Sequence, residues 1–245
     1  MKKTLGCVIS LCCSLSAVSH AETIKLTTMN WAPFYAEELD RNGFVTAIVQ
    51  ESLAASGYDS EIEFTEWNTA LKTVEAGTKD AIVGGYFSEE RQKVYNYSIP
   101  IYTVLSGLVK TKNLDLDLFT SFDQLNSYKM GKVAGGVVSK EYDSFQFNSL
   151  TGFDTTKAAV IALSQGEIDL YADNLSASRA VAQGLGIDPM SLELVQPPLE
   201  QNDLYLLISK SIPNSDALRD AFNQGLITIQ SNGVYQKILE DFNQN

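Results

Sequence analysis

One arginine and two tryptophans carry the most specific chemistry in this sequence. Arg91 follows an apolar segment and a turn, directly after Glu89 and Glu90. A guanidinium presents a planar fork of donors that matches a carboxylate, so Arg91 either binds an anion in a cleft or pairs with the two glutamates on the surface. Trp31 and Trp67 are the only tryptophans, and each follows a predicted strand. They either stack on a ligand or pack in the core.

Two glycine pairs lie at the ends of predicted strands. Gly84-Gly85 would let backbone groups approach a ligand closely. Gly135-Gly136 is predicted to open a helix, whose free N–H groups favour an anionic group. A simple tight strand-to-helix turn is an equally good interpretation of the second pair.

The first 21 residues predict a secretory signal peptide. Lys2 and Lys3 precede an apolar run over residues 5–18, and Ser19-His20-Ala21 is typical of a signal-peptidase site. The run is shorter than the roughly 20 residues that a spanning helix needs. Cleavage after Ala21 leaves 224 of the 245 residues and lowers the net charge from −12 to −14.

Cleavage also removes every cysteine and the single histidine, which are Cys7, Cys12, Cys13 and His20. The mature chain is therefore predicted to have no disulfide, thiol catalysis, Cys/His zinc site or Ser-His-Asp triad. We expect no cofactor and no metal. The acidity argues against nucleic acid and anionic membrane surfaces as partners. With no later segment apolar enough to span a bilayer, an exported periplasmic protein is expected.

Strand and helix patterns alternate and predict an α/β fold with two lobes. Gly77-Thr78-Lys79-Asp80 and Gly166-Glu167-Ile168-Asp169 both join a helix to a strand through Gly-x-x-Asp, which favours lobes of related design. Strands are predicted at 24–28, 61–65, 80–83, 129–134 and 168–172, and helices at 44–56, 68–76, 156–165, after 213–216 and at 234–242.

Several short segments follow one another along the mature chain. They are Trp31-Ala32-Pro33-Phe34, Gly43-Phe44, Trp67 before a helix, 80–85, 88–91, 97–102, and 218–238. In this order they resemble the extracellular solute-binding proteins of family 3, which deliver amino acids and related solutes to ABC transporters. The resemblance covers essentially all of the mature chain.

The resemblance implies a type II periplasmic-binding-protein fold, with two α/β lobes, two crossover strands and a ligand cleft between the lobes. Lobe 1 would comprise 22–103 plus 208–245, and lobe 2 would comprise 104–207. The crossovers would lie near Thr103–Ser106 and Asp203–Leu207. The implied function is that of a monomer that captures a small carboxylate-bearing solute, an amino acid or a derivative, and passes it to the membrane subunits of an ABC transporter without catalysis.

The resemblance also implies the site. Arg91 matches the carboxylate-binding arginine of the family, and the two tryptophans match its aromatic stacking positions. Tyr35 and Tyr86 would extend the aromatic wall. The expected ligand-binding residues are Trp31, Tyr35, Trp67, Gly84, Gly85, Tyr86, Arg91, Gly136, Val137, Asp173 and Asn174.

Lobe 2 departs from the family pattern at the position that usually carries a carboxylate for the ligand's ammonium. Counting from Asp169, this position is Asn174, and Asp173 comes one residue earlier. The position of a Ser or Thr near the ligand carboxylate is filled by Tyr86 in lobe 1 and by Gly136 or Val137 in lobe 2. A modified amino acid, an amine-poor carboxylate and a larger aromatic-stacking solute are therefore open alternatives, with Asp203 and Glu200 as other sources of negative charge.

Two other functions remain open at this point. Cyclohexadienyl dehydratases share the implied fold and need a cleft carboxylate as general acid, for which Asp173 or Glu200 is the candidate here. A ligand-sensing module acting through a separate membrane partner is the other alternative.

Overall fold

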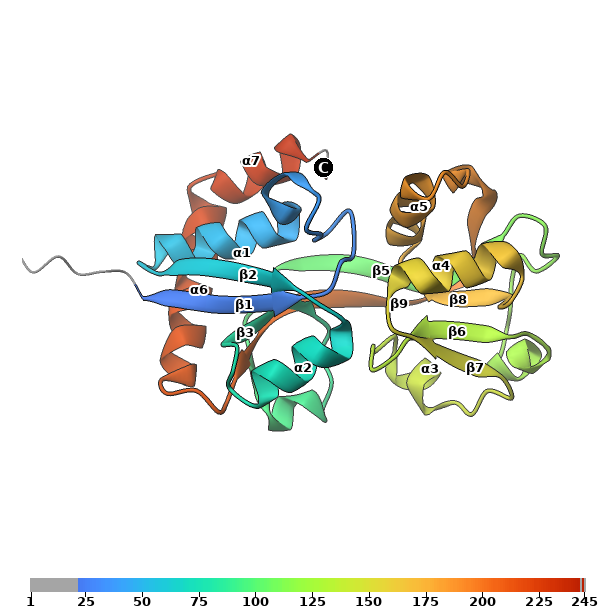
Figure 1. Cartoon of the computed structure of the whole chain (residues 1–245), viewed down its shortest axis with the longest axis horizontal. Helices are drawn as coiled ribbons and strands as arrows, with labels where there is room; N and C mark the ends of the chain where they lie inside the picture. The colour runs from blue at the N-terminus through green and yellow to red at the C-terminus, as the bar shows by residue number, and fades with distance from the viewer. Residues whose placement is uncertain (1–21, 243, 245) are drawn as a thin grey trace, which may run out of the picture.

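Two lobes lie side by side and are connected by long strands that run through both (Figure 1). The computed structural model describes residues 22–242 and residue 244. The predicted signal peptide therefore lies outside the described residues. Within the described part of the chain, no helix is both long enough and apolar enough to cross a membrane.

Lobe 1 is built around parallel strands with helices on both faces. Strand β1 pairs in parallel with β2 and with β3, and β3 pairs antiparallel with the long strand β9 (Leu192–Ser209). The elements of this lobe are β1 (Thr23–Thr28), α1 (Phe44–Ala55), β2 (Asp59–Phe64), α2 (Trp67–Glu75), β3 (Ala81–Gly85), β4 (Tyr95–Tyr97), α6 (Ser215–Ser231) and α7 (Val234–Asp241), with 3-10 turns at Asp40–Asn42 and Arg91–Lys93.

Lobe 2 repeats the parallel arrangement on a smaller scale. Strand β6 pairs in parallel with β7 and with β8, and β8 pairs antiparallel with β5. The elements of this lobe are β6 (Met130–Val133), α3 (Lys140–Ser144), β7 (Leu150–Phe153), α4 (Thr156–Gln165), β8 (Leu170–Asp173) and α5 (Leu175–Gly184), with 3-10 turns at Phe122–Ser127 and Pro189–Ser191.

Strands β5 (Tyr102–Thr111) and β9 (Leu192–Ser209) cross between the lobes as an antiparallel pair. Their pairing runs from Tyr102 opposite Leu204 to Thr111 opposite Leu192, with a register shift after Ser106. The segments expected as crossovers from the sequence lie within these two strands. Because β9 also pairs with β3 and β4, one continuous strand belongs to both lobes.

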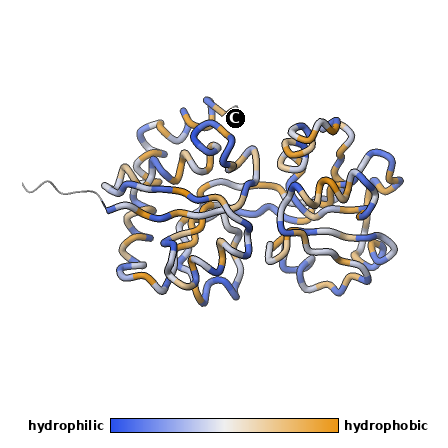
Figure 2. The backbone as a smooth tube through the Cα atoms, in the orientation of Figure 1, coloured by the Kyte–Doolittle hydropathy of each residue, from blue (hydrophilic) through white to orange (hydrophobic). Residues whose placement is uncertain are grey.

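The core of lobe 1 depends on close packing of α1 against α6. Gly225 of α6 lies so near α1 that an added Cβ would be 1.9 Å from the carbonyl oxygen of Ser52. Phe44, Ile48 and Phe222 are fully buried at this contact region, and each such side chain contributes about 1.5–3 kcal/mol by leaving water. Figure 2 shows hydrophobic stretches along the inner strands of each lobe and hydrophilic stretches in many outer turns.

The two Gly-x-x-Asp junctions have the same geometry in the two lobes. Gly77 and Gly166 both adopt a left-handed conformation, with φ of +72° and +73°, which glycine adopts without steric cost. Asp80 accepts a hydrogen bond from the backbone N–H of Lys25 at 2.7 Å, and Asp169 accepts one from Lys129 at 2.7 Å. Each aspartate thereby ties the incoming strand to the neighbouring parallel strand.

The segment after β6 differs from the prediction that Gly135-Gly136 opens a helix. Helix α3 begins at Lys140, and the side chain of Ser139 caps it by accepting from the backbone N–H of Tyr142. Gly135 has φ of +73°, and the N–H of Gly136 donates to the carbonyl oxygen of Val133 at 3.0 Å. The glycine pair therefore forms a tight turn directly after β6 and does not begin a helix.

Candidate functional site

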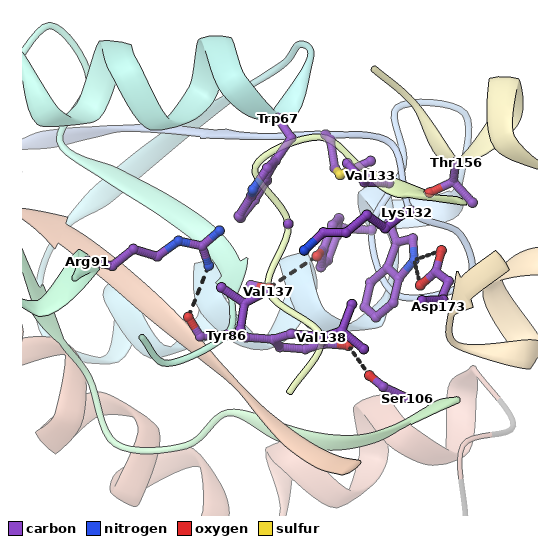
Figure 3. A pocket seen from close by; sticks show the side chains of 16 residues that line it. Trp67, Tyr86, Arg91, Ser106, Lys132, Val133, Val137, Val138, Thr156 and Asp173 are labelled. Carbon is purple, nitrogen blue, oxygen red and sulfur yellow. Dashed lines mark hydrogen bonds between the residues drawn. The ribbon is translucent and has the colours of Figure 1, made fainter. Parts of the chain in front are cut away.

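A pocket of about 70 Å³ lies where the strand ends of the two lobes meet, and side chains from both lobes line it (Figure 3). Its lining combines aromatic and aliphatic side chains with a few charged groups, the usual make-up of a small-molecule site. The lining residues are Met29, Trp31, Tyr35, Trp67, Gly84, Tyr86, Arg91, Ser106, Lys132, Val133, Gly136, Val137, Val138, Thr156, Ala172 and Asp173.

Arg91 is a buried cation, 8% exposed, whose described partners are carbonyl oxygens. Its guanidinium donates to Gly135 of lobe 2 at 2.7 Å and to Tyr86 at 3.2 Å. None of the ion pairs in the described chain includes Arg91, and Glu89 pairs with Lys140 instead. Burial lowers the pKa of Arg91, but a guanidinium stays charged at neutral pH. A buried charge without a counter-ion is costly, so this site favours an anion.

The two tryptophans are buried in lobe 1 and also line the pocket. Trp31 stacks on Phe34 with 4.3 Å between ring centroids, and its indole N–H donates to both carboxylate oxygens of Asp173, at 3.0 and 3.2 Å. The Arg91 guanidinium lies 5.2 Å from the ring centroid of Trp67. Each tryptophan is therefore packed in the core of lobe 1 and also exposes part of its ring to the pocket.

Asp173 supplies the carboxylate of the pocket. It ends β8 and accepts hydrogen bonds from the Tyr171 hydroxyl at 2.7 Å and from the backbone N–H of Asn174 at 2.7 Å, in addition to the Trp31 indole. Burial raises the pKa of Asp173 to about 6, although these donors act in the opposite direction. The carboxyl group is therefore poised to change charge just below neutral pH.

Asn174 does not line the pocket, although counting from Asp169 placed the ligand-facing position there. Its side chain caps helix α5 by accepting from the backbone N–H of Ala177 at 3.0 Å, and its amide donates to the carbonyl oxygen of Leu105 at 3.0 Å. Both polar ends of the side chain are thus engaged in fixing the start of α5 against the crossover strand.

The remaining expected residues divide into those that line the pocket and one that does not. Tyr35, Tyr86, Gly84, Gly136 and Val137 line it. At Gly84, φ is +83° and an added Cβ would lie 2.2 Å from the Tyr35 ring, so this position excludes side chains.

Gly85 faces the core instead of the pocket, because an added Cβ would lie 2.7 Å from the Leu207 side chain. Gly84 and Gly85 are successive residues of β3 and therefore face opposite sides of the strand.

The two carboxylates named as alternative charge sources lie on β9, outside the pocket lining. Asp203 accepts hydrogen bonds from the hydroxyls of Thr103 and Tyr205, and Glu200 is exposed. Neither supplies charge to the pocket in this structure.

Seven lining residues were not predicted from the sequence: Met29, Ser106, Lys132, Val133, Val138, Thr156 and Ala172. Two of them carried a usable signal. Thr156 follows Thr155, the side-chain cap of the predicted helix α4, and Lys132 lies near the end of the predicted strand β6, where strand ends of an α/β lobe form ligand sites. In the described chain, no group of three His, Cys, Asp or Glu side chains is placed to hold a metal ion.

Solved structures of three functional kinds share this fold. A histidine kinase sensor domain with similarity to periplasmic binding proteins has a TM-score of 0.80 at 15% identity, covering 91% of this chain and 96% of its own. The substrate-binding protein AbpA of an amino acid ABC transporter from Streptococcus pneumoniae, bound to L-arginine, has a TM-score of 0.74 at 20% identity, covering 90% and 94%. The GluR0 ligand-binding core from Nostoc punctiforme, in complex with L-glutamate, has a TM-score of 0.75 at 17% identity, covering 91% and 100%.

These likenesses establish the mixed α/β periplasmic-binding-protein fold of type II. No curated protein sequence gives a significant match to the chain. The sequence profile described as bacterial extracellular solute-binding proteins, family 3, matches residues 24–245, which is nearly the whole described chain. With the two-lobed fold and a pocket between the lobes, this match shows that the chain belongs to the bacterial extracellular solute-binding proteins of family 3.

Proposed function

We propose that this protein captures a small carboxylate-bearing solute, an amino acid or a derivative of one, in the pocket between its lobes. The observation that carries the proposal is Arg91, a buried cation in the pocket with carbonyl partners and no described carboxylate partner. A ligand carboxylate would complete its coordination. Each charge-assisted hydrogen bond formed there contributes about 1.5–3 kcal/mol.

The surroundings of Arg91 supply the rest of the recognition. The apolar part of a ligand would contact Trp31 and Trp67, and an ammonium group would approach Asp173 of lobe 2. AbpA holds L-arginine and the GluR0 core holds L-glutamate, which supports an amino-acid-like ligand here. Because Arg91 and Asp173 lie in different lobes, a ligand that contacts both favours hinge closure about β5 and β9.

Family membership and the predicted signal peptide support delivery to an ABC transporter in the periplasm. The closed, ligand-bound form would be the one that the membrane subunits recognise. We propose that the protein binds its ligand without chemical turnover and acts as a monomer.

Calorimetry with Arg91→Ala tests the proposal. The ligand is first identified by mass spectrometry of the solute that co-purifies with the protein, backed by a thermal-shift screen of amino acids and small carboxylates. Arg91→Ala should weaken the binding of this ligand by about tenfold to a hundredfold. Arg219→Ala, which removes a surface arginine paired with Asp216 and Asp220, is the matched control and should leave the affinity unchanged. Wild-type affinity in Arg91→Ala would overturn the site assignment.

A dehydratase-like activity is the second candidate, because the pKa of Asp173 is raised to about 6 in the pocket. A carboxyl group with such a pKa is suited to act as a general acid. Incubation of the protein with prephenate or arogenate tests it directly. Product that forms with the wild type and disappears with Asp173→Asn would establish catalysis, whereas an unchanged substrate favours the binding function.

A further inference from the structure

Lys132 places a second cation in the lining of the pocket. It lies on β6 of lobe 2 with its side chain 17% exposed, pairs with Asp143, and lies 5.9 Å from the ring centroid of Tyr142. The ammonium group of Lys132 carries three N–H donors, and Asp143 is the one hydrogen-bond acceptor described for them. Figure 3 shows the Lys132 side chain reaching inward among the lining residues, with its nitrogen on the side of Val137 and Arg91.

The partner of Lys132 lies outside the pocket. Asp143 lines a wider groove of about 780 Å³ and is not among the residues that line the inner pocket. Lys132 and Arg91 line both spaces, so the two cations lie where the pocket opens into the groove. Asp143 is also occupied by the backbone N–H of Val138 at 2.8 Å, which fixes it to the loop after β6.

The residues that line the pocket include more cations than carboxylates, and the carboxylate that balances Lys132, Asp143, lies in the outer groove. Arg91 and Lys132 are cations, and Asp173 is the only carboxylate among the lining residues. That carboxylate already accepts hydrogen bonds from Trp31, Tyr171 and the backbone of Asn174. The lining therefore presents Arg91, which has no carboxylate partner, and Lys132, which has donors left beyond its pair with Asp143. Asp173 is the one carboxylate that faces them, and it is largely occupied. This arrangement disfavours a second positive charge on the ligand.

We propose that Lys132 binds a second anionic group of the ligand, so that the site selects small dicarboxylates, including acidic amino acids, over their neutral and cationic analogues. This inference rests on the proposed function, because it takes Arg91 as the site of the first carboxylate. It assigns to Lys132 the discrimination between ligands that Arg91 alone would bind equally well.

Matched ligand pairs and matched variants test the inference by calorimetry at neutral pH. The dicarboxylates are succinate, glutarate, L-aspartate and L-glutamate, and their isosteric monoamides are succinamate, glutaramate, L-asparagine and L-glutamine, with L-arginine as the cationic ligand. The wild type should bind at least one dicarboxylate about tenfold or more tightly than its monoamide. Lys132→Met should remove this preference, so that the dicarboxylate and its monoamide bind with similar affinity.

Two further variants separate ligand binding from a structural role. Asp143→Asn removes the partner and keeps the cation, so it should preserve the preference for the dicarboxylate. Lys140→Met removes an exposed lysine of the outer groove that pairs with Glu89, and should change nothing. If Asp143→Asn loses the preference as Lys132→Met does, the pair positions the loop and the inference is wrong.

The outcomes also distinguish this inference from the proposed function. If the wild type binds monoamides or L-arginine as tightly as dicarboxylates, in a manner that depends on Arg91, only the selection by Lys132 is overturned. If the wild type binds no member of the panel, the selection of dicarboxylates is overturned, and the proposed function is tested by Arg91→Ala with the ligand that co-purifies. A Lys132→Gln variant that keeps a neutral donor controls for any loss of folding, and should show the same loss of preference.

Discussion

Arg91 and Asp173 are two buried charges that the fold holds in opposite ways. The carbonyl oxygens around Arg91 orient its donors but cannot neutralise its charge. Asp173, in contrast, is surrounded by donors from Trp31, Tyr171 and the backbone, and burial still raises its pKa. Because Arg91 lacks a counter-ion, an anionic ligand would gain most binding free energy there.

Asp173 makes the stability of the protein depend on pH. Because its pKa is raised from 3.8 to about 6, the folded state holds a proton that the unfolded chain releases between about pH 4 and pH 6. Its contribution to the free energy of unfolding is therefore fully present below pH 4 and is lost as pH rises through 6. Asp173→Asn does not titrate, so the stability of the variant relative to wild type should increase over this range by up to about 3 kcal/mol.

Denaturant unfolding at a series of pH values checks this sign. The exposed Asp115→Asn is the control for the loss of a carboxylate. If the stability of Asp173→Asn relative to wild type stays constant from pH 4 to pH 7, or falls, the raised pKa is contradicted.

At the scale of single residues, the sequence predicted that the pocket contains Arg91, the two tryptophans and most of the aromatic lining. It did not decide which of the adjacent Asp173 and Asn174 faces the pocket. Asn174 comes directly before α5, and asparagine is a strong helix cap. Recognising that helix would have removed Asn174 from the site and left Asp173 in it. The position of Lys132 near a strand end indicated the edge of the sheet where ligands bind. It did not show that the side chain faces the pocket, because that direction depends on where the turn at Gly135 begins.

Among the elements, the duplicated Gly-x-x-Asp junction is where sequence and structure agree most closely. Asp80 accepts from the backbone N–H of Lys25 within β1, and Asp169 accepts from that of Lys129 directly before β6, at the same distance in both lobes. The junction therefore sets the register of β3 against β1 and of β8 against β6. The Gly-x-x-Asp motif therefore has a structural role, and it lies away from the pocket.

Asp169→Ala should destabilise the protein by about 1 kcal/mol, because it removes one hydrogen bond that water partly replaces at an exposed position. Asp80→Ala should have an effect of similar size, since its bond to Lys25 has the same geometry. The measurement is the midpoint of thermal unfolding, expected to fall by about 2–4 °C for each. The surface variant Asp220→Ala is the control, and equal midpoints for all variants and wild type would show that the junctions carry no stability.

The predicted helices α1, α2 and α4 are each followed by a glycine with positive φ. Helices α3 and α5 were not predicted, although Ser139 and Asn174 cap them. Strands formed by tertiary pairing were predicted least. Helix α4 matches its predicted bounds, from the Thr155 cap to the left-handed Gly166. The 18 residues of β9 include Glu193, Gln196 and Pro197 and show no strict alternation. Its strand conformation comes from pairing with β5, β3 and β4, which no local pattern reveals.

For the whole molecule, the contacts between lobes involve the same groups that line the pocket. Trp31 of lobe 1 donates to Asp173 of lobe 2, and Arg91 and Trp67 donate to the carbonyl oxygen of Gly135. The backbone link consists of β5 and β9. A ligand in the pocket therefore acts on the interface between the lobes and not on either lobe alone.

This arrangement predicts that a bound ligand stabilises both lobes together. A ligand that binds only the folded state, at 100 times its Kd, adds about 2.7 kcal/mol to the free energy of unfolding. For a chain of this size that raises the Tm by about 5–10 °C. Scanning calorimetry should show the heat absorption of the whole molecule moving upward as one transition. Arg91→Ala, whose Kd is expected to be about tenfold to a hundredfold higher, should show about half of the wild-type shift or less at the same ligand concentration. If ligand moves only part of the transition and leaves a component at the original temperature, the ligand contacts a single lobe, and its assignment to the pocket between Arg91 and Asp173 is wrong.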